Sequence, residues 1–126
     1  MAISEPIGEF SLTSTGVTVI ANPSGGGSNQ VNVEGTATGY GTVVGTLTFQ
    51  TDAPDAAGGS CTWAGQGYLD DGTSVGGAGQ GVFTALGNHK WRVRLLMQIS
   101  NGTLLVTDGE MSLDGRSYQG QICEWT

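Results

Sequence analysis

Two carboxylates and two glutamines occupy alternate positions near the end of the chain. They are Asp108 and Glu110, and then Gln119 and Gln121. Alternate residues of a β-strand point to the same face of a sheet. A carboxyl group removed from water has a raised pKa and can act as a general acid or base, while neighbouring amides orient a ligand. We therefore take Asp108 and Glu110 as candidate catalytic residues. The alternative is that both acids lie at the solvated open rim of a barrel, where they form hydrogen bonds only with the glutamines.

The strand expected to position these groups covers residues 89–100, with the sequence HKWRVRLLMQIS. Its odd positions from Trp91 to Ile99 are all apolar, and its even positions are mostly polar or charged. This period of two is typical of a half-buried strand. The dipeptides Gly87-Asn88 and Asn101-Gly102 flank the strand and favour tight hairpin turns.

Similar turn signals divide most of the chain into strands. Asp71-Gly72 and Asp114-Gly115 complete a meander of five strands, expected at residues 60–69, 73–86, 89–100, 103–113 and 116–125. A strand with a bulge near Gly16 and two strands around Tyr40, with Thr38 opposite Thr42, precede the meander. Eight short antiparallel strands without a helix favour an all-β, up-and-down barrel, because closure removes the sheet edges.

The length of the chain suits a single domain over residues 1–126. Residues 1–8 are expected to be a loose lead-in, and residues 22–29 a flexible loop rich in Gly and Ser. Gly accounts for 23 of the 126 residues, and the apolar residues are mainly β-branched or aromatic, as in β proteins.

Pairing the strands through two-residue turns predicts the inward face of the barrel. In this register Val93 lies opposite Val82 and Glu110, and Leu95 lies opposite Gln80 and Asp108. The residues of this face that we expect to bind a ligand are Trp63, Gln80, Trp91, Leu95, Met97, Gln119, Gln121 and Trp125. Small residues on the same face should leave room for a cavity; they are Gly35, Ala37, Gly45, Gly65, Gly67, Gly76 and Ala78.

The opposite face carries most of the charged side chains and is therefore expected to lie outside. It also holds five large apolar residues, namely Phe83, Leu96, Leu105, Met111 and Ile122. This number is high for a surface exposed to solvent, and a homo-oligomer formed through the outer face would cover these residues.

The charge of the chain limits the partners that it can bind. Four Lys and Arg residues stand against 11 Asp and Glu, which gives a net charge of −7. A basic patch for nucleic acid or for an anionic membrane is therefore not expected. The start of the sequence has no signal-peptide pattern, so we expect a soluble, cytoplasmic protein. With one histidine, no histidine-based triad or metal cluster is expected, and no cofactor.

The two cysteines, Cys61 and Cys123, fall on strands four apart. Opposite walls of an eight-stranded barrel are about 16 Å apart, too far for a disulfide. We expect two free thiols.

The segment VEGTATGYGTVVGTLTF, residues 33–49, has the Thr-rich, Gly-alternating character of certain small barrels. With the hairpin meander and the acidic, helix-poor composition, it resembles the calycin-type barrels that include allene oxide cyclases and dirigent proteins. The resemblance covers residues 10–125 at the level of architecture and carries over no functional residue. Lipocalin-like and streptavidin-like barrels fit the strand count equally well.

Two functions follow as expectations. An apolar cavity walled by tryptophans would be the site of a cofactor-free isomerase or cyclase, with Asp108 or Glu110 moving a proton. Alternatively, the barrel binds a small apolar molecule without catalysis, or fills its core and serves as an interaction module.

Overall fold

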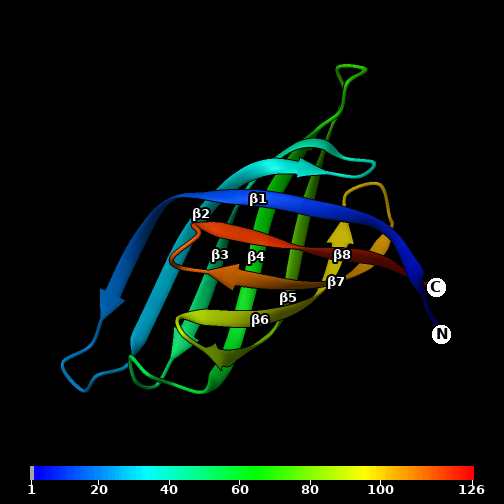
Figure 1. Ribbon diagram of the computed structural model, residues 1–126. Helices are drawn as coiled ribbons and strands as arrows, with labels where there is room; N and C mark the ends of the chain where they lie inside the picture. The colour runs from blue at the N-terminus through cyan, green and yellow to red at the C-terminus, as the bar shows by residue number, and fades with distance from the viewer. Residues whose placement is uncertain (1) are drawn as a thin grey trace.

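The computed structural model describes residues 2–126 and consists of eight antiparallel strands that close into a barrel (Figure 1). Each strand pairs with its neighbours in the chain, and β1 pairs with β8 to close the sheet. The fold class predicted from the sequence is confirmed. The strands are β1 (Ile3–Ala21), β2 (Gly27–Ala37), β3 (Gly41–Thr51), β4 (Gly58–Tyr68), β5 (Ser74–Gly87), β6 (Lys90–Ile99), β7 (Leu104–Ser112) and β8 (Ser117–Trp125).

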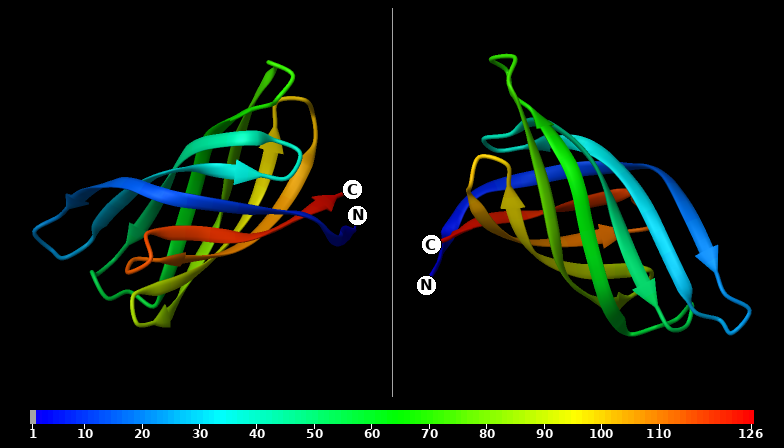
Figure 2. Two further views of the ribbon diagram at one scale, coloured as in Figure 1. Left: turned by 45° about the horizontal axis from the view of Figure 1, so that its top comes forward. Right: turned by 180° about the vertical axis from the view of Figure 1, so that it is seen from behind.

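The two ends of the chain lie together at one end of the barrel (Figure 2). The backbones of Ala2 and Thr126 exchange hydrogen bonds of 2.7 and 2.9 Å. Residues 3–8, expected to be a loose lead-in, belong to β1 instead; residue 1 lies outside the described residues. Within residues 2–126, no helix has the length and apolar character needed to cross a membrane.

The bulge in β1 and the faces of β2 and β3 are as the sequence predicts. The pairing of β1 with β2 shifts between Ser14 and Gly16, which confirms the bulge. In the β2–β3 pair the register differs by two residues from the prediction, because Val43 lies opposite Gly35 and not Ala37. A shift of two residues leaves every side chain on its original face.

Two later hairpin turns are one residue longer than predicted. A backbone hydrogen bond of 2.9 Å joins Leu69 to Thr73, so the β4–β5 loop contains residues 70–72. A bond of the same length joins Ile99 to Thr103, so the β6–β7 loop contains residues 100–102. Each loop ends in a glycine with a positive φ angle, as is common in three-residue hairpin loops.

The β5–β6 turn is displaced by one residue along the chain. Asn88 and His89, with φ angles of 54° and 56°, form this turn in place of Gly87-Asn88. As a result Val93 lies opposite Phe83 rather than Val82. On its other side, the longer β6–β7 loop places Gly109 rather than Glu110 opposite Val93. A shift of one residue turns a strand over, so the predicted faces of β5 and β7 are wrong.

The register errors of β5 and β7 affect their outer neighbours, β4 and β8, in different ways. β8 has the predicted register with β7, since Asp108 lies opposite Gln121, and its predicted face is therefore wrong as well. For β4 two one-residue shifts cancel, and Cys61 and Trp63 face inward as predicted.

The core contains most of the apolar residues that were assigned to the exterior. Phe83, Leu105, Met111 and Ile122 are at most 6% exposed and belong to the core, whereas Leu96 is 39% exposed. Their predicted exterior position is wrong, apart from Leu96. The apolar excess that favoured a homo-oligomer is therefore explained by the core of a single barrel.

Inward glycines make room for rings rather than for empty space. A Cβ atom on Gly65 would lie 2.5 Å from Cζ2 of Trp63, and one on Gly45 would also overlap this indole. A Cβ atom on Gly109 would lie 2.7 Å from the ring of Phe10. Gly76, predicted to face inward, pairs with the exposed Gln66, and an added Cβ would meet nothing within 4 Å.

Candidate functional site

The candidate catalytic carboxylates lie on the outer face of the barrel. Asp108 is opposite Arg94, and Glu110 is opposite Arg92. The guanidinium of Arg92 donates two hydrogen bonds to Asp108, of 3.0 Å from Nε and 2.6 Å from Nη2. These bonds hold the pKa of Asp108 below its ordinary value. The prediction of an inward carboxylate with a raised pKa is therefore wrong for Asp108.

The other polar candidates share this exterior position. Glu110, Gln80, Gln119 and Gln121 are exposed. Trp125 is partly buried and pairs with Ile3 in the outward alternation of β8. The inward position predicted for these five side chains is wrong, because the one-residue register shifts turn β5, β7 and β8 over.

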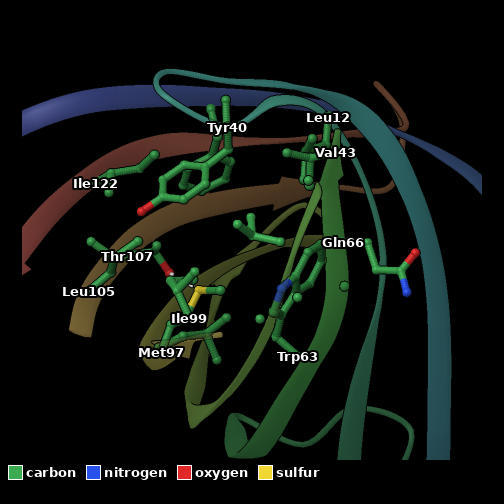
Figure 3. Close-up of a pocket in the computed structure, with 18 of the residues that line it drawn as sticks. Leu12, Tyr40, Val43, Trp63, Gln66, Met97, Ile99, Leu105, Thr107 and Ile122 are labelled. Atoms are coloured by element: carbon green, nitrogen blue, oxygen red, sulfur yellow. Dashed lines mark hydrogen bonds between the residues drawn. The ribbon is translucent and has the colours of Figure 1, made fainter. Parts of the chain in front are cut away.

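A pocket of about 80 Å³ occupies one end of the interior (Figure 3). Three predicted ligand-binding residues, Trp63, Leu95 and Met97, line it; their binding of a ligand stays a prediction. Other apolar side chains complete the wall, including Phe10, Leu12, Val43, Val75, Ile99, Leu105 and Ile122. The pocket reaches the surface beside Tyr40 and Gln66, which are partly or fully exposed.

Trp91 faces inward as predicted but lies at the opposite end. There it lines a second hollow, of about 290 Å³, together with Phe49, Phe83 and Met111. The bulged end of β1 adds Val17, which is 45% exposed. The predicted set of three inward tryptophans around one cavity is therefore wrong, since only Trp63 lines the smaller pocket.

Two hydroxyl groups interrupt the apolar wall of the smaller pocket. Thr107 is 6% exposed, and its Oγ1 donates a weak hydrogen bond to Sδ of Met97 at 3.9 Å. Tyr118 is 2% exposed, and its hydroxyl has no hydrogen-bond partner in the described part of the chain. Burial raises the pKa of Tyr118, and the nearby Thr107 hydroxyl offsets a part of this rise.

The mouth of this pocket carries a phenol and a carboxylate. Glu124 lies opposite the inward Leu105 and thus follows the inward alternation of β8, although the sequence placed it outside. Tyr40 stands in the turn between β2 and β3. Partial burial, and secondarily the negative charge of Glu124, raise the pKa of Tyr40. The two side chains are therefore close enough to influence each other electrostatically.

The thiol of Cys61 is buried in the core and does not line either pocket. Burial raises its pKa to about 11, so at neutral pH it is a protonated, weakly reactive group. Cys123 is partly buried, and both cysteines are free thiols. No group of three or more metal-ligating side chains occurs among residues 2–126.

Sequence reasoning missed Tyr40, Thr107, Tyr118 and Glu124 as parts of the site. A signal for one of them was present, because Tyr118 belongs to the same alternating set of β8 as the apolar Ile122. A register chosen to bury this set, instead of one based on two-residue turns, would have placed Tyr118 inside the barrel.

Comparisons of the chain with protein-family models, with curated proteins and with solved structures gave no match. The resemblance to allene oxide cyclases and dirigent proteins is thus supported only by the eight-stranded closed barrel itself. Because fold does not determine function, the site must carry the functional argument.

Proposed function

We propose that this barrel binds a small, uncharged, apolar molecule in the pocket between Trp63, Met97 and Ile122. The observation that supports this is a cavity of about 80 Å³ whose described lining includes no carboxylate, amine or imidazole. An apolar cavity of about 150 Å³ holds one benzene molecule. The enclosed part of this pocket is about half that size, so a bound five- or six-membered ring would extend past Tyr40 into the open mouth.

Binding without chemistry fits this site better than the cyclase or isomerase activity suggested by the family resemblance. That activity needed a desolvated carboxylate inside the barrel, and Asp108 is instead outside and paired with Arg92. Glu124 acts electrostatically on Tyr40 at the mouth and does not line the pocket. We therefore place a carrier or sensor of small apolar molecules first and a cofactor-free isomerase second.

Two neighbouring glycines of β5 provide a matched test. A Cβ atom on the inward Gly77 would lie 3.1 Å from Cδ1 of Ile99 and 3.7 Å from Cε of Met97, both of them flexible side-chain ends. Gly77→Val should fill the pocket and abolish binding, whereas the outward Gly76→Val should leave binding unchanged.

The measurement is a tryptophan-fluorescence titration with cyclopentanone, cyclopentane and benzene, preceded by native mass spectrometry of the purified protein. Saturable binding to the native protein and to Gly76→Val, but not to Gly77→Val, is the expected result. Equal binding by both variants would exclude this pocket as the site.

A further inference from the structure

The Tyr118 hydroxyl is a buried group that makes no hydrogen bond within the described residues, although the Thr107 hydroxyl lies near enough to lower its pKa. The side chain is 2% exposed, lines the pocket, and has no hydrogen-bond partner for its oxygen. Buried polar groups in native proteins are nearly always paired with protein, water or ligand. The unpaired hydroxyl therefore marks a position at which a bound molecule can complete the hydrogen bonding.

The position of this hydroxyl is set by rigid packing. The ring of Tyr118 lies against Phe10 with centroids 4.8 Å apart and planes inclined at 57°. Gly109 makes room for both rings, since a Cβ atom there would lie 2.7 Å from Cζ of Phe10 and 2.9 Å from Cε1 of Tyr118. A ring held in place loses little conformational entropy when its hydroxyl gains a hydrogen-bond partner.

The second hydroxyl of the pocket defines the kind of group that is needed. Thr107 directs its proton at the sulfur of Met97, a weak acceptor, and can turn it toward a better one. A phenol and an alcohol can each donate and accept a hydrogen bond, and here the proton of neither one has a strong acceptor. The pocket lining offers no cation to balance a negative charge, and Glu124 at the mouth would repel one.

We infer that the ligand carries a neutral hydrogen-bond acceptor, such as a ketone or an ether oxygen, that accepts from Tyr118 with support from Thr107. This inference rests on the proposed binding function and narrows its ligand class from apolar molecules in general to apolar molecules with one such oxygen. A site built around a donor discriminates against analogues that leave the donor unpaired.

The test compares cyclopentanone with methylenecyclopentane, which has the same shape but no acceptor oxygen. The native protein should bind the ketone about tenfold more tightly, the usual effect of one neutral hydrogen bond. Tyr118→Phe should abolish this preference, because it weakens the binding of the ketone and not that of the hydrocarbon. Tyr68→Phe, a matched change at a tyrosine that is 46% exposed and does not line the pocket, should preserve the preference.

Infrared spectroscopy detects the hydrogen bond itself, and its signal would not change if Tyr118 only supported the structure of the pocket. The carbonyl stretch of bound cyclopentanone should shift to lower wavenumber in the native protein and return toward its value in apolar solvent in Tyr118→Phe. Because the comparison of the two ligands and the spectrum also use the native protein, the inference is tested even if Tyr118→Phe fails to fold.

The possible failures are distinct. If neither compound binds the native protein, the proposed function itself is wrong. If both bind equally and the carbonyl stretch is unshifted, the pocket binds apolar molecules but the role of Tyr118 is overturned.

Discussion

The Cys61 thiol illustrates how burial alone changes the chemistry of a residue. Its ordinary pKa of 9.0 rises to about 11 in the folded protein. The unfolded thiol therefore loses its proton first as the pH rises. We predict that the free energy of unfolding falls between pH 9 and pH 11, because ionisation favours the unfolded state in this range.

Urea denaturation at pH 8, 9, 10 and 11 measures this loss. Tyr118, whose pKa is also raised by burial, should contribute at the upper end of the range. Cys61→Ala should lower the overall stability and flatten the dependence on pH. The same pH slope in Cys61→Ala and in the native protein would contradict the assignment.

Asp108 illustrates the opposite effect, in which a partner stabilises the charged form. Arg92→Gln removes both hydrogen bonds to Asp108, so the carboxyl pKa should rise toward its ordinary value of 3.8. Arg94→Gln removes only a weaker electrostatic influence and should raise it less. Carbon-13 NMR titration of Asp108 measures both changes.

The same variants report on function. Because the depressed pKa belongs to the folded state, the Arg92 pair stabilises the protein above pH 3.8 and loses its effect as the pH falls further. Ligand binding in the pocket should be unchanged in Arg92→Gln. Loss of ligand binding in Arg92→Gln would indicate that Asp108 belongs to the binding site after all.

At the scale of the strands, the inner wall depends on glycines that lie beneath aromatic rings. Gly65→Ala would place a Cβ atom 2.5 Å from Cζ2 of Trp63, and the indole would have to leave its position in the wall. We predict a loss of about 1–3 kcal/mol of stability, as in other overpacked cores.

Gly76→Ala is the matched control, since its Cβ would meet nothing within 4 Å. It should be neutral or slightly stabilising, because alanine restricts the unfolded chain. Thermal or urea unfolding of both variants measures the difference. Equal stability of the two would mean that Trp63 does not lie over Gly65.

The strands also show how far sequence reasoning reaches. The alternation of apolar residues in β6 is enough to predict that Val93 and Leu95 are buried, and the structure confirms this with exposures of 0 and 2%. Strand count and closure follow from turn signals and from the absence of helices. The error arose in the loops, whose lengths determine which residues of neighbouring strands are paired.

Asp71-Gly72 and Asn101-Gly102 illustrate why a turn signal does not determine loop length. Both dipeptides occur in two-residue turns, yet here each side-chain Oδ1 accepts a hydrogen bond from the backbone N–H two residues later, at 2.9 Å from Thr73 and 3.0 Å from Thr103. This Asx-type contact accompanies a three-residue loop. The extra residue moves Asp108 outside and brings Thr107 inside.

At the scale of the whole barrel, the charges are distributed unequally between its ends. Lys90 and Arg92 begin β6, and Arg116 lies in the β7–β8 turn, all at the end away from the pocket mouth. This end also carries carboxylates, at Asp52, Asp55 and Asp114, whereas the described turns at the mouth end carry no Lys or Arg. Glu124 and the β4–β5 turn, which carries Asp70, are at the mouth end. An anionic ligand would therefore approach the pocket against repulsion.

We predict that pentanoate binds more weakly than 2-hexanone, which has nearly the same shape but no charge. Higher ionic strength should narrow the difference, because salt screens exposed charges. Glu124→Gln should narrow it further without changing the affinity for the ketone. Calorimetric titration at two salt concentrations measures these effects, and tighter binding of pentanoate would contradict the charge argument.

The central claim, that the mouth end of the barrel holds the ligand site, is tested most directly by methyl NMR. Met97 lines the smaller pocket and Met111 lines the hollow at the other end, so their ε-methyl signals report separately on the two ends. Titration with cyclopentanone should shift the Met97 signal saturably and leave the Met111 signal in place. A shift of the Met111 signal alone, or of neither signal, would contradict the account.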